Sequence, residues 1–255
     1  MILRAIEAGQ GAPVVLLHGL FGTARNLGVV QRALAPRFRT IALDLRNHGA
    51  SPHAAEMNYR LMAADVLETL TEQAALPAVL IGHSMGGKAA MMAALTRPEA
   101  VTRLLVADIA PVPYAHDNAR IAEAMLALPL PPGLTRAAAD AALAQAVPDA
   151  PMRGFLLQNL VVGEHPQWRI GLAEIAAAMR AIEGWTAPDA AQYRGPTLFV
   201  AGAASDYIRP DHRPAIRALF PAARFVTLKG AGHWVHADNP AGFVAVIEAF
   251  LAGVG

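Results

Sequence analysis

Short runs of β-branched and aliphatic residues recur along the chain and alternate with segments long enough to form helices. The runs occupy residues 14–17, 41–43, 78–81, 104–107 and 198–201. Because each run is apolar throughout, it predicts a strand buried on both faces, as in a parallel sheet. Helix-sized segments lie between the runs, at residues 26–34, 62–72 and 85–95. This alternation predicts an α/β fold with a mostly parallel, doubly wound sheet and crossover helices on both sides.

The alternation stops after residue 109 and resumes near residue 197. The residues in between show helical periodicity in three stretches, 119–128, 136–147 and 168–180. We therefore expect a core formed by residues 1–111 and 191–255 and a helical cap formed by residues 112–190. The cap is expected to be inserted after the sixth strand.

The composition excludes several classes of protein. The chain has 255 residues, no Cys, and 21 Lys plus Arg against 20 Asp plus Glu, which leaves a formal net charge of +1. This balance offers no broad attraction to nucleic-acid phosphates, and the lack of Cys removes thiolate nucleophiles, disulfides and Cys-based zinc sites. No apolar run reaches the ~18 residues of a membrane span, and the first residues lack the apolar core of a secretion signal. We therefore expect no nucleic-acid partner, no membrane insertion and a cytoplasmic location.

The strongest local motif is Gly-His-Ser-Met-Gly at residues 82–86, which follows a predicted strand and precedes a predicted helix. A sharp strand-to-helix turn strains the backbone of Ser84, and the flanking glycines leave room for it, so the hydroxyl points clear of the sheet. The helix that follows directs its positive end at the place where an oxyanion would develop. The motif predicts Ser84 as a nucleophile; the alternative is a glycine-rich turn whose serine has no catalytic role.

A serine hydroxyl needs a base to take its proton, and that base is expected far away in the sequence. His233 lies in a Gly-Ala-Gly-His-Trp segment between a strand predicted at residues 224–228 and a final helix. Serine, acid and then histidine is the chain order expected for this architecture. His233 is therefore the predicted general base, whereas His83 and His236 are interpreted as structural.

Two aspartates are candidates for the acid that orients His233. Asp206 follows the strand predicted at residues 198–201, and Asp108 ends the strand predicted at residues 104–107. Both lie at carboxyl ends of strands, where open α/β sheets build their sites. The residues themselves leave the choice open, since aspartate is also common as a cap or turn residue.

A second glycine-rich loop, residues 18–22, follows the first strong strand. The N–H groups of Leu20 and Met85 are expected to form an oxyanion hole, with Phe21 in place of Leu20 if the loop is shifted by one residue. The polar loop at residues 44–52 is interpreted as a brace for this loop rather than as a second catalytic centre. No pattern of metal ligands is present, so neither a metal nor another cofactor is expected.

Together these motifs resemble the α/β-hydrolase superfamily and, within it, the YbfF-like esterases. The resemblance rests on segments outside the expected cap, at residues 18–22, 44–49, 57–59, 81–88, 108–111 and 230–236. It implies an α/β-hydrolase fold and a small-molecule ester as the substrate. The implied activity is the hydrolysis of carboxylic esters with short to medium acyl chains, and of acyl thioesters, by Ser84, His233 and an acid through an acyl-enzyme.

The resemblance also bears on the acid and on the cap. YbfF-like esterases usually carry an aspartate at the position of Asp108 and lack one at the position of Asp206, which favours Asp108. The presence of Asp206 in this chain departs from that pattern. The cap is expected to roof the site, with candidate lining residues Tyr114, Arg120, Phe155, Trp168 and Trp185.

Other functions stay open at this stage. A C–C bond hydrolase or an acyltransferase can use the same three side chains, because the difference lies in the cap and in access of water. Dehalogenase and epoxide hydrolase chemistry is disfavoured, since it needs a carboxylate nucleophile where this chain has Ser84. A non-catalytic binding protein of this fold is expected to lack one of the three groups, and here all are present.

Overall fold

The computed structural model describes residues 1–115 and 117–252; residue 116 of the expected cap and residues 253–255 of the expected core lie outside the described residues. Within this range the centre of the molecule is a seven-stranded sheet in the order β1-β3-β2-β4-β5-β8-β9. The strands are β1 (Ala5–Ala8), β2 (Pro13–Leu17), β3 (Arg39–Leu43), β4 (Ala78–His83), β5 (Val101–Ala107), β8 (Thr197–Gly202) and β9 (Ala223–Leu228). Only the edge strand β1 is antiparallel to its neighbour.

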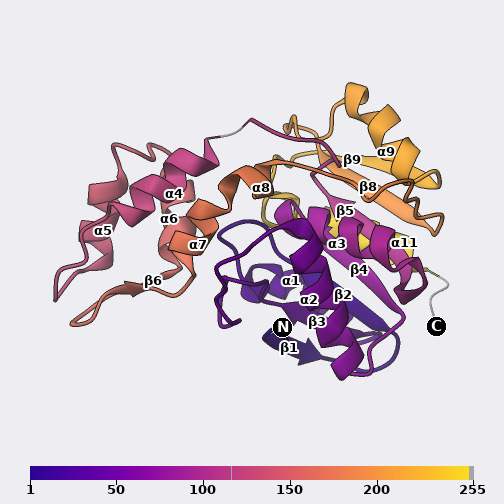
Figure 1. The fold of residues 1–255 in the computed structure, drawn as a ribbon, viewed down its shortest axis with the longest axis horizontal. Coiled ribbons are helices and arrows are strands. Elements are labelled where there is room, and N and C mark those ends of the chain that lie inside the picture. The colour runs from indigo at the N-terminus through magenta and orange to yellow at the C-terminus, as the bar shows by residue number, and fades with distance from the viewer. Residues whose placement is uncertain (116, 253–255) are drawn as a thin grey trace.

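Helices cover both faces of this sheet (Figure 1). On one face, α1 (Gly28–Leu34) and α11 (Pro240–Leu251) bury their apolar residues against the strands. On the other face, α2 (Tyr59–Glu72), α3 (Met85–Thr96) and α9 (Arg213–Leu219) do the same. Because each central strand is covered twice, every residue of β4 is buried. The prediction of a mostly parallel, doubly wound α/β sheet is therefore confirmed.

A helical insertion, defined here as the elements between β5 and β8, lies beside the sheet (Figure 1). Its helices are α4 (Asn118–Leu126), α5 (Arg136–Leu143), α6 (Ala150–Leu157), α7 (Leu172–Ala177) and α8 (Met179–Glu183). It also contains a short antiparallel pair, β6 (Leu160–Val161) and β7 (Gln167–Trp168). A separate small core, which includes Leu134, Leu143 and Leu157, forms within it.

The structure differs from the sequence-based expectation in two details of this insertion. It follows the fifth strand of the chain and not the sixth, because the residues before β2 form only one strand and a turn with Gly9 and Gly11 at positive φ. The stretch 168–180 is not one helix: Trp168 ends the short strand β7, and α7 begins only at Leu172. The pairing of Trp168 with Leu160 across the hairpin overrides the helical periodicity.

The remaining elements are short. Single turns of 3-10 helix form η1 (Ala24–Leu27), η2 (Pro98–Ala100) and η3 (Pro210–His212), and a four-residue helix, α10 (Val235–Asp238), precedes α11. Among the residues that the structure describes, no helix has both the length and the apolar character needed to cross a bilayer.

Candidate active site

Ser84 lies in the sharp turn between β4 and α3. Its backbone adopts φ +52° and ψ −120°, a conformation that residues other than glycine rarely adopt. The flanking glycines are required sterically: a Cβ on Gly82 would lie 2.3 Å from the Gly86 carbonyl oxygen, and one on Gly86 would lie 2.5 Å from the Leu17 carbonyl oxygen. The turn therefore holds Ser84 at the carboxyl edge of the sheet.

A hydrogen-bonded chain links Ser84 to side chains from two other strand ends. The Nε2 atom of His233, in the loop after β9, lies 3.0 Å from Ser84 Oγ. The Nδ1 atom of His233 lies 2.8 Å from Oδ2 of Asp108, which directly follows β5. This arrangement can take a proton from a serine hydroxyl and hold the resulting imidazolium against a carboxylate.

The geometry separates the two candidate acids. Asp108 is completely buried and meets His233, whereas Asp206 is exposed and makes no hydrogen bond with His233 among the contacts of the described residues. Asp108 reaches this position because its backbone has φ +52° and its N–H donates to the Val200 carbonyl of β8 at 2.8 Å.

The site contains one hydroxyl that the sequence analysis missed. Ser205, in the loop after β8, donates its hydroxyl to Oδ2 of Asp108, and the Gly202 N–H donates to Oδ1 at 2.9 Å. Three donors, counting His233, thus converge on the two oxygens of this buried carboxylate and satisfy them. The sequence feature that could have pointed to Ser205 is its position just after a buried strand and next to Asp206.

The N–H groups of Leu20 and Met85 are available to a ligand. Across the described residues, neither donates a hydrogen bond to another part of the protein, and Met85 is the first residue of α3, where an N–H has no intrahelical acceptor. The carbonyl of Gly19 accepts hydrogen bonds from Gly22 N–H at 3.0 Å and from His18 Nδ1 at 2.8 Å. The Gly19 carbonyl and the Leu20 N–H belong to the same trans peptide, so the Leu20 N–H points away from these two donors.

The alternative donor, Phe21, is already used. Its N–H donates to Nε2 of His48 at 3.1 Å, and its carbonyl accepts from Asn159 of the insertion at 2.7 Å. Phe21 also has φ +58°, so the loop bends at this residue. The Phe21 N–H is therefore occupied, whereas the Leu20 N–H has no acceptor among the described residues.

Two buried histidines tie this loop to the one after β3. His18 Nε2 accepts the Leu45 N–H at 3.0 Å, and His48 Nε2 accepts the Phe21 N–H at 3.1 Å. Burial lowers the pKa of His18 to about 4 and that of His48 to about 3, so both rings are neutral and can accept these bonds. The loop after β3 thus braces its neighbour, as its sequence indicated.

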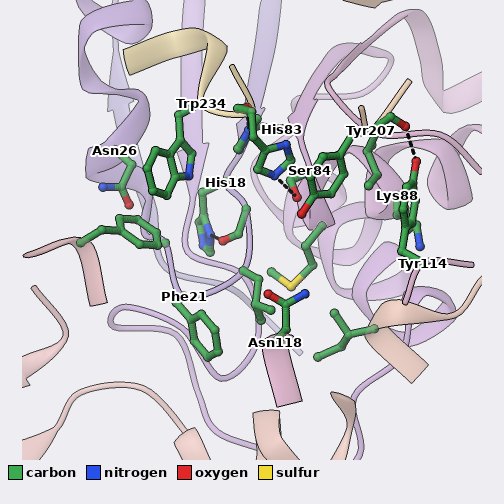
Figure 2. A pocket seen from close by; sticks show the side chains of 18 of the residues that line it. His18, Phe21, Asn26, His83, Ser84, Lys88, Tyr114, Asn118, Tyr207 and Trp234 are labelled. Carbon is green, nitrogen blue, oxygen red and sulfur yellow. Dashed lines mark hydrogen bonds between the residues drawn. The ribbon is translucent and has the colours of Figure 1, made fainter. Parts of the chain in front are cut away.

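One cavity brings these groups together (Figure 2). It is lined by Ser84, His233 and Leu20 from the core and by Tyr114 and Phe155 from the insertion.

Three of the candidate lining residues lie elsewhere. Arg120 is exposed and forms an ion pair with Asp117. In α4 the cavity is lined by Asn118 and Ile121, which are three residues apart and share one face of the helix, and Arg120 lies off that face. Trp185 follows α8 and packs against Tyr59 in a neighbouring surface pocket. Trp168 pairs within the β6–β7 hairpin, outside the cavity.

Lys88 is the second residue that sequence reasoning missed. It lies one helical turn after Ser84 on α3, is almost fully buried, and lines the same cavity. Its Nζ donates to the carbonyls of Glu183 at 3.2 Å and Gly184 at 2.8 Å and lies 4.9 Å from the centre of the Tyr114 ring (Figure 2). Burial lowers the pKa of Lys88 to about 7. The sequence feature that could have pointed to Lys88 is its place as the one charged residue of the predicted helix at residues 85–95.

Within the described residues, no group of three or more His, Asp or Glu side chains is arranged to hold a metal ion.

The fold and these strand-end loops define an α/β hydrolase, and the chain belongs to the α/β-hydrolase fold family, whose model matches residues 12–240. The chain is 39% identical to the esterase YbfF of Escherichia coli, over 95% of this chain and 94% of that protein. It is 43% identical to the sn-1-specific diacylglycerol lipase ABHD11 of Mus musculus, over 94% of this chain and 80% of the relative. The expected resemblance to YbfF is thus confirmed.

A solved structure described as a marine microorganism esterase superposes with a TM-score of 0.94. The two sequences are 34% identical, and the match covers 98% of this chain and 99% of the other. These relatives support carboxylic ester hydrolysis as the general activity of this chain.

Proposed function

We propose that the protein is a serine hydrolase that cleaves carboxylic esters through an acyl-enzyme. The observation that carries the proposal is the hydrogen-bonded chain from Asp108 through His233 to Ser84. In the proposed reaction, His233 Nε2 takes the proton of Ser84 as Oγ attacks the ester carbonyl, and Asp108 stabilises the imidazolium. The same histidine then returns the proton to the leaving alcohol and activates a water that cleaves the acyl-enzyme.

The N–H groups of Leu20 and Met85 are assigned to the oxyanion of the tetrahedral intermediates. Donors already positioned where charge develops stabilise the transition state without reorganising. His18 supports this assignment, because its ring holds the Gly19 carbonyl and so orients the Leu20 N–H.

We infer that residues 112–190 act as a cap that selects the acyl group. Tyr114, Ile121, Met152 and Phe155 of this segment line the cavity beside Ser84. Their apolar character fits short to medium acyl chains, in oxygen esters or in acyl thioesters. A cytoplasmic location stays a prediction from the sequence.

The experiment that tests the function is turnover of p-nitrophenyl acetate, butyrate and longer esters by the wild type and by Ser84→Ala. We expect the variant to lose turnover by about four powers of ten or more, because the attacking oxygen is gone. Thermal unfolding of both proteins checks that the substitution leaves the fold intact. Equal turnover by the two proteins would reject Ser84 as the nucleophile, and no turnover by either would reject these esters as substrates.

Transfer of the acyl group to an alcohol is a second candidate, favoured by one relative. The chain is 34% identical to a probable alcohol acetyltransferase of Saccharomyces cerevisiae, over 92% of this chain and 75% of that protein. Assays with p-nitrophenyl acetate and added ethanol separate the two reactions. A hydrolase releases mainly acetate, whereas a transferase forms ethyl acetate at the expense of acetate.

A further inference from the structure

The ring of Tyr207 lies flat against the imidazole of His233. The two ring centres are 3.7 Å apart and the planes are inclined by 18°. Tyr207 comes from the loop after β8, two residues beyond Ser205, and lines the cavity with Ser84 (Figure 2). The sequence motifs described above assign no role to Tyr207.

The stack restrains a motion that the hydrogen bonds of His233 leave open. Nδ1 is bonded to Asp108 and Nε2 to Ser84, at 2.8 and 3.0 Å, which fixes both ends of the ring. The ring can still tilt about the line between these two atoms, and tilting misaligns both bonds. A parallel ring in van der Waals contact blocks this tilt.

Tyr207 is itself held by the same network. Its N–H donates to Ser205 Oγ at 3.3 Å, and that hydroxyl donates to Asp108. Its carbonyl accepts from the Tyr114 hydroxyl at 2.5 Å, and the Tyr114 oxygen accepts the Ala110 N–H at 2.8 Å. Contacts from the segment after β5, from the loop after β8 and from the insertion therefore set the position of the ring.

The stack also acts on charge. An imidazolium over the face of an aromatic ring is attracted by the ring's negative face. Among the described residues, Asp108, His83 and His236 are ionisable groups that contact His233 or interact with it electrostatically. The pKa of His83 lies well below 6.5 and that of His236 is lowered to about 4, both mainly by burial, so these rings are neutral near pH 7.

The groups that act on Tyr207 leave it uncharged as well. Burial raises the pKa of its hydroxyl to about 12, and the nearby carboxylates of Asp108, Asp206 and Glu183 act in the same direction. The ring of Tyr207 therefore presents an uncharged aromatic face to His233, on which an imidazolium is attracted.

We propose that Tyr207 is a positioning residue for the general base: its ring fixes the plane of His233 and stabilises the imidazolium that forms when Ser84 attacks. The proposal rests on the proposed function, in which His233 accepts the proton from Ser84. It assigns to Tyr207 a role in the rate of the chemical step and not only in shaping the cavity.

The test compares Tyr207→Leu and Tyr207→Phe with the wild type in the pH profile of kcat/KM for p-nitrophenyl butyrate. Leucine keeps an apolar cover over His233 and removes the aromatic face, so the pKa of His233 should fall. We expect the acidic limb to move to lower pH by roughly half to one unit and kcat to fall about tenfold, with a smaller change in KM. Tyr207→Phe keeps the aromatic face and should keep the position of the limb.

Phe155→Leu is the matched control, because it removes another aromatic ring that lines the same cavity. The Phe155 ring packs at an inclination of 48° against Trp234, with the ring centres 5.7 Å apart, rather than against His233. This substitution should leave the limb in place. A limb that Tyr207→Leu does not move, or that Phe155→Leu moves as far, overturns the proposal. If Tyr207→Leu lowers the melting temperature strongly, Tyr207→Met takes its place.

Titration of the His233 ring by NMR gives a readout that needs no turnover. The pKa of His233 should be lower in Tyr207→Leu than in the wild type, and an unchanged value overturns the proposal even in an inactive protein. Failure of the proposed function is distinct, since it shows as wild-type protein without Ser84-dependent turnover.

Discussion

At the scale of single residues, the site depends on one buried carboxylate. Asp108 accepts hydrogen bonds from the Gly202 N–H, the Ser205 hydroxyl and His233, and it is completely buried. A buried carboxylate is stable only when such donors surround it. The same hydrogen bonds hold the carboxylate in the orientation in which it accepts from His233.

Exchanging each aspartate for asparagine separates the two acids. Asp108→Asn replaces an acceptor with an amide that can donate to His233 Nδ1, which favours the tautomer that cannot take the serine proton. We expect turnover of p-nitrophenyl butyrate to fall by about four powers of ten in this variant. The matched variant Asp206→Asn changes an exposed side chain and should stay within a factor of about two, as surface changes usually do. The reverse ranking of kcat values would make Asp206 the acid.

At the scale of elements, α3 connects Ser84 to the insertion. It begins at Met85, directly after Ser84, and its Lys88 reaches the carbonyls at the end of α8. The carbonyls at a helix C-terminus lack intrahelical partners and attract a cation, so one ammonium group satisfies them. Lys88 therefore joins the core to a helix whose C-terminal residues line the cavity, at the cost of burying an amine.

This buried amine predicts how stability depends on pH. The pKa of Lys88 is lowered by burial to about 7, against 10.5 for an ordinary lysine, so the unfolded chain binds more protons than the folded one between these values. Stability from this group is thus present above pH 10.5 and lost as the pH falls towards 7. We expect the free energy of unfolding, relative to Lys88→Met, to rise by at most about 1.4 kcal/mol per pH unit in this window.

Urea unfolding at pH 7, 8, 9 and 10 measures this difference. Lys229→Met is the matched control, since it removes the other lysine of the chain from an exposed position and should leave the pH dependence of the wild type unchanged. A constant difference between the wild type and Lys88→Met across the four pH values would contradict the prediction.

At the scale of the whole molecule, buried neutral histidines surround the carboxyl edge of the sheet. His18, His48, His83 and His236 all have a pKa below the ordinary 6.5, mainly because burial disfavours the charged ring. In the unfolded chain these rings take up protons near pH 6.5, whereas the folded protein resists protonation until the pH is much lower. The folded state consequently loses stability as the pH falls below 6.5.

Two histidine-to-glutamine substitutions, one at a buried and one at an exposed position, test whether buried histidines cause this loss of stability in acid. His48→Gln removes one ring whose pKa is about 3, so the free energy of unfolding should decline less steeply between pH 6.5 and 5, by about 1.4 kcal/mol per pH unit. His165→Gln, at an exposed position of the insertion, should keep the wild-type slope. Denaturant unfolding of the three proteins over this range gives the slopes, and identical slopes in all three would exclude His48 as a contributor.

The sequence alone determined the parts of this protein that depend on local chemistry. Runs buried on both faces predicted five strands of the sheet, and the glycines around Ser84 predicted the turn that carries it. His233 was predicted as the general base from its place after the last strand, and its Nε2 lies 3.0 Å from Ser84 Oγ. These features follow from periodicity and sterics, which act over a few residues.

Only the tertiary structure decided which of the distant side chains meet. Whether Asp108 or Asp206 reaches His233 depends on the register of β5 against β8 and on a single residue at positive φ, neither of which a local pattern records. The same holds for Ser205 on Asp108, Lys88 at the end of α8 and Tyr207 on His233. The physical reason is that each contact joins loops from different strands, and its distance is set by how whole elements pack rather than by the residues beside it.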